Sequence, residues 1–216
     1  MKAILFDLDG TLVDSSEGII KSVRRSLQDF GLEEADDEKL KLFIGPPLVD
    51  SFMRLYHFTE EQAVKAVETY RVRYKKKGML ECRLYPYVKE CITQLKEEGY
   101  LIGIASSKPE VFCRAILENL GVLDLFDDVA GATFDGRISN KEEVLDEVMR
   151  RWNHLNREDM CLIGDTIYDV KGANYAGIAC IGVTYGFGDV EEMKQEGIVA
   201  LCDSLDHLPT LLKELN

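Results

Sequence analysis

The sequence predicts an α/β fold, a doubly wound parallel sheet into which a second, all-helical domain is inserted. Three observations lead to this prediction. From residue 84 onward, short apolar runs typical of buried strands alternate with amphipathic helical patterns. The strands are continuously apolar, which indicates a parallel sheet covered by helices on both faces. Residues 15–83 break this alternation and contain only helical patterns.

The α/β part begins with the apolar run Ala3–Phe6, which leads directly into Asp7, Asp9 and a Gly10-Thr11 turn. Helices are expected to end at Gly99 and Gly121, because glycine readily adopts the left-handed conformation that closes a helix. The later strands are expected at Leu101–Ala105, Asp128–Gly131, Met160–Ile163, Ile178–Val183 and near Ile198–Cys202. The helices are expected at Pro86–Glu98, Pro109–Leu120, Asn140–Trp152, around Val170–Tyr175 and at Ser204–Leu215.

The insertion is expected to form a separate cap domain, residues 15–83, with residues 1–14 and 84–216 as the core domain. Pro46 and Pro47 force a break between two helices, since neither can continue one. An insertion between the first and second strands suggests a small domain over the carboxyl edge of the sheet, where open α/β sheets bind their ligands. The helical patterns span Ser16–Phe30, Asp37–Phe43, Leu48–Tyr56 and Thr59–Lys77.

Composition narrows the class of partner. Of the 216 residues, 46% are apolar and 30% charged, as in an ordinary globular protein. The net charge of −13 opposes binding to nucleic acid or to an anionic membrane. An anionic substrate would therefore need local lysines or a metal ion. The six cysteines show no metal-binding spacing, and there is no signal peptide or long apolar run, so we expect a cytoplasmic protein.

Four groups of chemically active residues follow predicted strands. They are Asp7 with Asp9, Ser106 to Lys108, the region of Lys141, and Asp165 with Asp169. In a parallel sheet these strand ends converge on one crevice. Clustered carboxylates suit a hard cation such as Mg²⁺, and a hydroxyl with an ammonium group would complete a phosphate site. The pattern therefore indicates phosphoryl transfer.

These residues resemble the four motifs of the haloacid dehalogenase superfamily. The motifs are Asp7-Leu8-Asp9-Gly10-Thr11-Leu12, Ser106, Lys141 and Gly164-Asp165-Thr166-Ile167-Tyr168-Asp169. The resemblance covers essentially the whole chain and is greatest to phosphoglycolate-phosphatase-like enzymes. It implies a Rossmann-like core, a helical cap, and Mg²⁺-dependent hydrolysis of a small phosphomonoester through an aspartyl-phosphate.

The resemblance also implies roles for single residues. Asp7 would be the nucleophile, and Asp9 the general acid and base. Thr11 would orient Asp9 and help to bind the phosphate. Mg²⁺ would be held by the Asp7 carboxylate, the Asp9 backbone carbonyl and Asp165, with Asp169 either a direct ligand or one shell further out.

Several choices remain open at this stage. Ser106, with Ser107, is expected to bind the phosphate, although Ser106 is equally suited to capping the following helix. Lys141 is favoured over Lys108 as the lysine that bridges the phosphate, because Lys108 fits a solvated surface lysine better. Gly45, in the loop before the helix at residue 48, resembles a substrate-contacting cap loop, and a plain helix break explains it as well.

The reaction itself has rivals. A phosphomutase of the same superfamily usually carries a histidine early in the cap, and Asp14–Ile20 contains none. A phospho-receiver also uses aspartates, Mg²⁺, a hydroxyl and a lysine, but it lacks a cap and its phosphorylated aspartate lies on a later strand. We therefore expect a phosphatase acting on a small phosphorylated metabolite, whether phosphoglycolate-like, a sugar phosphate or a nucleotide, and existing as a monomer or weak dimer.

Overall fold

The computed structural model describes residues 1–215 and divides into two compact units. One contains residues 1–13 and the chain from 84 onward, and we call it the α/β unit. The other, Asp14–Arg83, is the helical unit. The two connecting segments, β2 (Val13–Asp14) and β3 (Arg83–Leu84), pair as a two-stranded sheet. Strands of two residues are too short to leave an alternating pattern, so the sequence did not predict them.

The α/β unit contains a six-stranded parallel sheet in the order β5-β4-β1-β6-β7-β8. The predicted fold class is confirmed. The strand order reverses around β1, which pairs with β4 on one side and β6 on the other, and ligands of such sheets bind at this switch point. The strands are β1 (Ala3–Phe6), β4 (Leu101–Pro109), β5 (Asp128–Ala132), β6 (Met160–Gly164), β7 (Ala179–Val183) and β8 (Ala200–Cys202).

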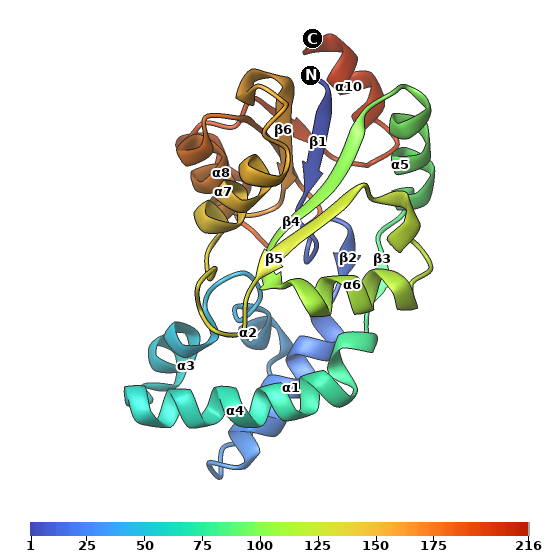
Figure 1. The fold of residues 1–216 in the computed structure, drawn as a ribbon. Helices are drawn as coiled ribbons and strands as arrows, with labels where there is room; N and C mark the ends of the chain where they lie inside the picture. Colours follow the sequence, from blue (N-terminus) through green and yellow to red (C-terminus); the bar gives the residue numbers. More distant parts are fainter. Residues whose placement is uncertain (216) are drawn as a thin grey trace. The chain divides into compact units, whose positions relative to one another are not determined.

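Helices cover both faces of this sheet. α7 and α8 lie on one face, and α5 and α10 lie on the other (Figure 1). Because side chains alternate along a strand, Ala3 and Leu5 enter the core under α7 and α8, whereas the equally buried Ile4 and Phe6 point to the opposite face. The helices are α5 (Val88–Glu97), α6 (Glu110–Asn119), α7 (Lys141–Arg151), α8 (Ile167–Ala176), α9 (Val190–Glu196) and α10 (Leu208–Glu214), with one-turn helices η2 (Leu123–Leu125) and η3 (Arg157–Asp159).

Three helices differ from expectation for local reasons. α9 was not predicted, although Asp189 caps it by accepting from the backbone of Glu191 and Glu192. α5 begins at Val88 rather than at residue 86, because Tyr87 adopts a left-handed conformation with φ of 65°. α10 begins only at Leu208, and its first turn contains Pro209, where a missing N–H costs nothing.

The helical unit contains the four expected helices. α4 begins with a reciprocal capping box between Thr59 and Gln62. The hydrophobic core of the helical unit includes Phe43 and Phe52, whose rings meet edge to face with centroids 4.8 Å apart. The elements are α1 (Ser16–Gln28), α2 (Asp37–Lys41), α3 (Leu48–Tyr56), α4 (Glu60–Lys76) and the one-turn helix η1 (Gly78–Leu80).

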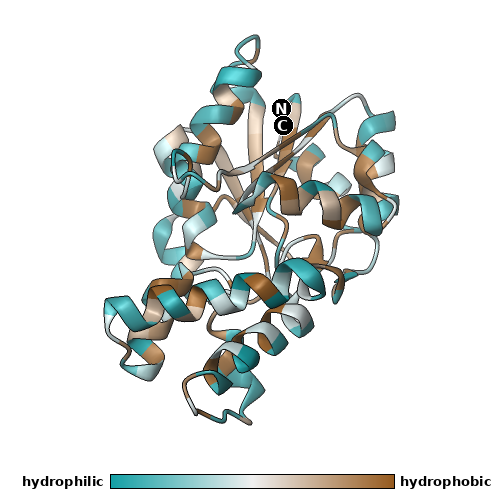
Figure 2. Cartoon of the chain, turned by 60° about the horizontal axis from the view of Figure 1, so that its bottom comes forward, coloured by the Kyte–Doolittle hydropathy of each residue, from teal (hydrophilic) through white to brown (hydrophobic). Residues whose placement is uncertain are grey.

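Hydropathy follows the architecture of each unit. Figure 2 shows helices on which hydrophilic and hydrophobic residues alternate, as expected for helices that bury one face only. No helix within residues 1–215 has both the length and the apolar character needed to cross a bilayer.

Candidate active site

Three aspartates come together at the carboxyl edge of the sheet, two of them directly after neighbouring strands and the third in a helix. Asp7 directly follows β1, and its backbone N–H donates to Ile163 of β6 at 2.9 Å, so the strand pairing fixes its place. Asp165 follows β6, and Asp169 lies in the first turn of α8. One carboxylate oxygen from each of the three lies within 4.8 Å of the others, and all three residues are buried.

Lys141 supplies a cation to this cluster. It is the first residue of α7, where Asn140 caps the helix by accepting from the Glu143 backbone. Its Nζ lies 2.8 Å from Asp7 Oδ1, 2.7 Å from Asp169 Oδ1 and 2.7 Å from the Ala105 carbonyl oxygen. The side chain is almost fully buried. The structure thus brings together the lysine and the carboxylates that the sequence placed on separate strands.

Burial and charge shift the protonation of these groups. Burial raises the pKa of Asp7 to about 6, and the nearby Asp169 charge adds to this effect while Lys141 opposes it. Burial, with the charges of Asp169 and Asp7, raises the pKa of Asp165 well above its usual value. Burial alone would lower the pKa of Lys141, but Asp169 and Asp7 outweigh it and raise that pKa. The aspartate cluster is therefore short of positive charge.

The donor set fits a hard divalent cation. Asp169 Oδ2 accepts hydrogen bonds from the backbone and hydroxyl of Thr166, at 3.0 and 2.8 Å. Its Oδ1 is buried, forms an ion pair with Lys141 and receives no hydrogen bond. Three carboxylates and one ammonium leave a formal charge of −2 when all are ionised. Asp7, Asp165 and Asp169, which offer oxygen ligands with that charge, could hold such a metal ion.

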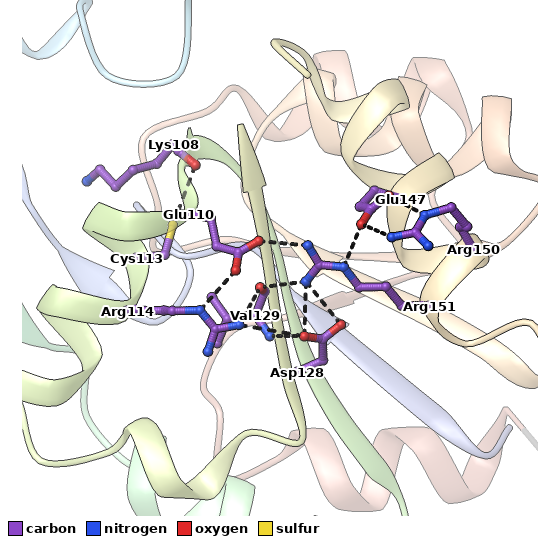
Figure 3. A network of polar contacts seen from close by, with 9 residues as sticks. All are labelled: Lys108, Glu110, Cys113, Arg114, Asp128, Val129, Glu147, Arg150 and Arg151. Atoms are coloured by element: carbon purple, nitrogen blue, oxygen red, sulfur yellow. Dashed lines mark hydrogen bonds and ion pairs between the residues drawn. The ribbon is translucent and has the colours of Figure 1, made fainter. Parts of the chain in front are cut away.

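Lys108 forms a second ion pair beside this cluster. Its Nζ lies 2.6 Å from Asp9 Oδ1, and only 9% of its side chain is exposed. The expectation that Lys108 is a solvated surface lysine is therefore wrong. The sequence showed that Lys108 follows a strand, but β4 continues to Pro109 with a register shift after Ser106, and this irregular segment turns the lysine inward. The Cys113 thiol, from α6, contacts the Lys108 carbonyl at 3.6 Å (Figure 3).

The other predicted residues are distributed as follows. Ser106 is buried, and its hydroxyl accepts from the Lys108 backbone at 3.4 Å. It does not cap α6, because the residue before that helix is Pro109 and no side chain caps the helix there. Ser107 neighbours it in β4 and is half-buried. Gly45, with φ of +99°, belongs to the helical unit, and its contact with substrate stays a prediction.

Thr11 has a different partner from the one expected. Its hydroxyl donates to Asp165 Oδ1 at 3.3 Å, so the prediction that it orients Asp9 is wrong. The chain bends back after Gly10, whose φ of +82° only glycine adopts easily, and Thr11 is thereby carried toward β6. Thr11 therefore helps to position Asp165.

The segment after β7 was assigned no role from the sequence. After β7, the Phe187 backbone N–H donates to Asp165 Oδ2 at 2.8 Å. Gly186 and Gly188 lie so close to Asp165 that a methyl group at either position would overlap it. The Tyr185 hydroxyl donates to the Thr11 carbonyl at 2.8 Å. Two glycines three and five residues after the predicted strand Ile178–Val183 were the available signal, since close approach of backbone to a site requires glycine.

Comparison with known proteins agrees with this geometry. A family model described as "haloacid dehalogenase-like hydrolase" matches residues 4–183. A protein named 5'-nucleotidase from Pseudomonas aeruginosa is 39% identical over 97% of this chain and 95% of its own length. A phosphoglycolate phosphatase from Vibrio parahaemolyticus is 28% identical, over 96% of this chain and 94% of its own.

Two further comparisons bear on the reaction. The tyrosine-protein kinase PtkA of Mycobacterium tuberculosis is 30% identical over 95% of this chain and 70% of its own. The crystal structure of a predicted phosphatase from Clostridium acetobutylicum is 43% identical, covers 99% of this chain and 98% of its own, and superposes with a TM-score of 0.93.

The motif residues converge at one edge of the sheet, and three of the proteins aligned over nearly the whole chain are named 5'-nucleotidase, phosphoglycolate phosphatase and predicted phosphatase. The protein is a phosphoric monoester hydrolase acting on small phosphate substrates. The chain belongs to the haloacid dehalogenase-like hydrolase family.

Proposed function

We propose that this phosphatase works in two steps through a phosphoryl group carried on Asp7. The observation that carries the proposal is the position of the Asp7 carboxylate. It is buried, with one oxygen held by Lys141 at 2.8 Å and with Asp165 and Asp169 beside it. A carboxylate is a weak nucleophile unless it is positioned and shielded from water, and this arrangement does both.

In the first step, an oxygen of Asp7 attacks phosphorus in line as the bond to the leaving alkoxide breaks. Asp9, in its protonated form, gives its proton to that alkoxide. In the second step, Asp9 takes a proton from water as the water oxygen attacks phosphorus, which releases inorganic phosphate and restores the Asp7 carboxylate. Lys108 holds Asp9 Oδ1 at 2.6 Å and leaves the other oxygen of Asp9 for proton transfer.

Mg²⁺ belongs to this proposal as the cofactor. Asp7, Asp165 and Asp169 would hold it, together with the Asp9 carbonyl. When bound, it supplies positive charge that neutralises the transferring phosphoryl group. The Lys141 ammonium contacts both Asp7 and Asp169 and so reduces the repulsion between their carboxylates. Ser106 and Ser107 would bind phosphoryl oxygens.

A nucleoside 5'-monophosphate is the substrate class we propose to test first. The relative named 5'-nucleotidase is 39% identical, against 28% for the phosphoglycolate phosphatase. A phosphoglycolate-like acid and sugar phosphates are the other members of the panel. The net charge of −13 and six free thiols support a cytoplasmic enzyme that acts on small metabolites rather than on nucleic acid or at a membrane.

Phosphate release from this panel with Mg²⁺ tests the proposal. Continuous release of many equivalents of phosphate is expected, and acid-quenched enzyme should carry label from a ³²P-substrate that hydroxylamine removes. A phospho-receiver would take up one equivalent and stall. A phosphomutase would yield an isomeric phosphate ester without releasing phosphate, and either result would contradict the proposal.

A further inference from the structure

Arg151, the last residue of α7, joins three elements of the α/β unit through a single guanidinium group (Figure 3). It donates to Glu110 Oε2 at 2.8 Å, at the start of α6. It also donates to Asp128 Oδ1 at 3.1 Å and to the Val129 carbonyl at 3.0 Å, both in β5. The Arg151 Nε also donates a hydrogen bond of 2.8 Å to Glu147 Oε1, one turn earlier on α7, and this bond orients the guanidinium group. Only 26% of the side chain is exposed.

Glu110 connects this network to the active site. It follows Lys108 by two residues, and its other carboxylate oxygen accepts from Arg114 at 2.9 Å. Gly131 of β5 lies against the turn between β4 and α6, which contains both Lys108 and Glu110. A Cβ atom on Gly131 would be 2.6 Å from the Lys108 carbonyl oxygen and 2.7 Å from the Glu110 nitrogen. The turn that presents Lys108 is therefore held between the backbone of β5 and the guanidinium of Arg151.

We propose that Arg151 is a positioning residue that keeps Lys108 within reach of Asp9, acting through Glu110. The proposal rests on the proposed function only in the catalytic consequence, because the contact itself can be measured without turnover. Regular pairing between β4 and β5 is interrupted between Ser106 and Pro109, so side-chain contacts add to what holds this turn in place. A planar guanidinium with several fixed donors suits this task better than an ammonium does.

The expected effect is on geometry more than on fold. Ion pairs that are partly exposed contribute little to stability. The Lys108–Asp9 contact, in contrast, spans 2.6 Å between two nearly buried groups. A misplacement near 1 Å in a catalytic group can cost roughly 100-fold in rate, so we expect Arg151→Ala to lose about 10- to 100-fold in kcat/KM.

Arg150→Ala is the matched control. Arg150 precedes Arg151 on the same helix, its guanidinium binds Glu147, and its side chain is 72% exposed. The two variants change the charge equally, but only Arg151→Ala removes the contacts to Glu110 and β5. Activity of Arg150→Ala should stay within about two-fold of the wild type, as expected for an exposed ion pair.

Lysine acylation followed by mass spectrometry tests the contact directly in the complete protein. Lys108 should be modified several-fold faster in Arg151→Ala than in the wild type or Arg150→Ala, while Lys141 stays protected. Unchanged labelling of Lys108 would overturn the proposal. Equal gains at Lys108 and Lys141 would do so too, since they would report general loosening of the unit.

A double-mutant cycle then tests the catalytic consequence. If Arg151 acts through Lys108, adding Arg151→Ala to Lys108→Met should lower kcat/KM much less than Arg151→Ala does alone. Losses that simply multiply would show that Arg151 acts by another route. Selective labelling together with an absence of Asp7-dependent turnover would leave the positioning role in place and refute the proposed function, so the two failures are distinguishable.

Discussion

Lys141 is the only ammonium in contact with both Asp7 and Asp169 among residues 1–215, and replacing it with Met should show how strongly the aspartate cluster depends on that charge. The substitution keeps an unbranched side chain in the space next to Gly172, where a methyl group on the glycine would already overlap Lys141. It removes the contacts of 2.8 and 2.7 Å to the two carboxylates and the 2.7 Å bond to the Ala105 carbonyl. The buried cluster then carries one more uncompensated negative charge.

Removal of one partner from a buried ion pair typically costs about 3–5 kcal/mol, because the other charge stays buried. Lys141 is almost inaccessible, so this range applies without a discount for solvent. For a chain of this length, each kcal/mol lowers Tm by roughly 2–4 °C, and the expected loss is about 6–20 °C at pH 8 in chelator.

The loss should shrink as the pH falls. The pKa of Asp7 is about 6 in the folded protein, against a model-compound value of 3.8, so the folded state binds more protons than the unfolded chain between these values. A group of this kind favours folding at low pH, and that contribution is lost as pH rises through the folded pKa. Without Lys141, the pKa of Asp7 should rise further, so the variant gains more than the wild type when the pH is lowered from 8 to 5.

Thermal unfolding of wild type, Lys141→Met and Lys171→Met at pH 5 and pH 8 checks this reasoning. Lys171 is an exposed lysine on α8 and controls for the change of residue type. Added Mg²⁺ should restore part of the lost stability, since ligand binding to the folded state stabilises it. A Lys141→Met protein as stable as the control at pH 8, or one destabilised equally at both pH values, would refute the charge argument.

Four further outcomes are expected. Asp7→Asn keeps the shape of the side chain but removes its nucleophilicity, so kcat should fall by orders of magnitude. Residual turnover of more than a few per cent, in a sample checked for deamidation, would exclude Asp7 as the nucleophile. Activity should vanish in chelator, return with Mg²⁺ and fall in excess Ca²⁺, because the looser coordination of Ca²⁺ misplaces the attacking carboxylate. Full activity of metal-stripped protein would argue against a metal-dependent reaction. Gly186→Ala should displace Asp165 and weaken Mg²⁺ binding measured by calorimetry, whereas Gly136→Ala, at an exposed turn where an added Cβ meets no atom within 4 Å, should leave it unchanged. Substitutions at Gly45–Leu48 should re-rank kcat/KM among leaving groups and leave hydrolysis of the phosphoenzyme unaltered, and equal losses on every substrate would assign that loop to the chemistry instead.

The fold was predictable because its pattern is strong. Continuous apolar strands alternating with amphipathic helices leave few alternatives to a parallel sheet, and polar residues directly after strands mark its carboxyl edge. On this basis the sequence could assign Asp7, Lys141, Asp165 and Asp169 to one cluster, although more than 150 residues separate Asp7 from Asp165. Short elements such as β2 and β3 escaped, because two residues carry no periodicity.

The site's finer contacts depend on backbone irregularity, which apolar patterns do not encode. The predicted strand ended at Ala105, so Lys108 was expected in a solvent-exposed loop after it. The register shift after Ser106 instead keeps the segment against Gly131 and turns the lysine toward Asp9. The family resemblance assigned Thr11 to Asp9, whereas the bend at Gly10 that carries its hydroxyl to Asp165 depends on one φ angle. In both cases a glycine permits the close approach. Glycines that follow or face a strand end in a parallel sheet therefore indicate where irregular backbone is positioning a functional side chain.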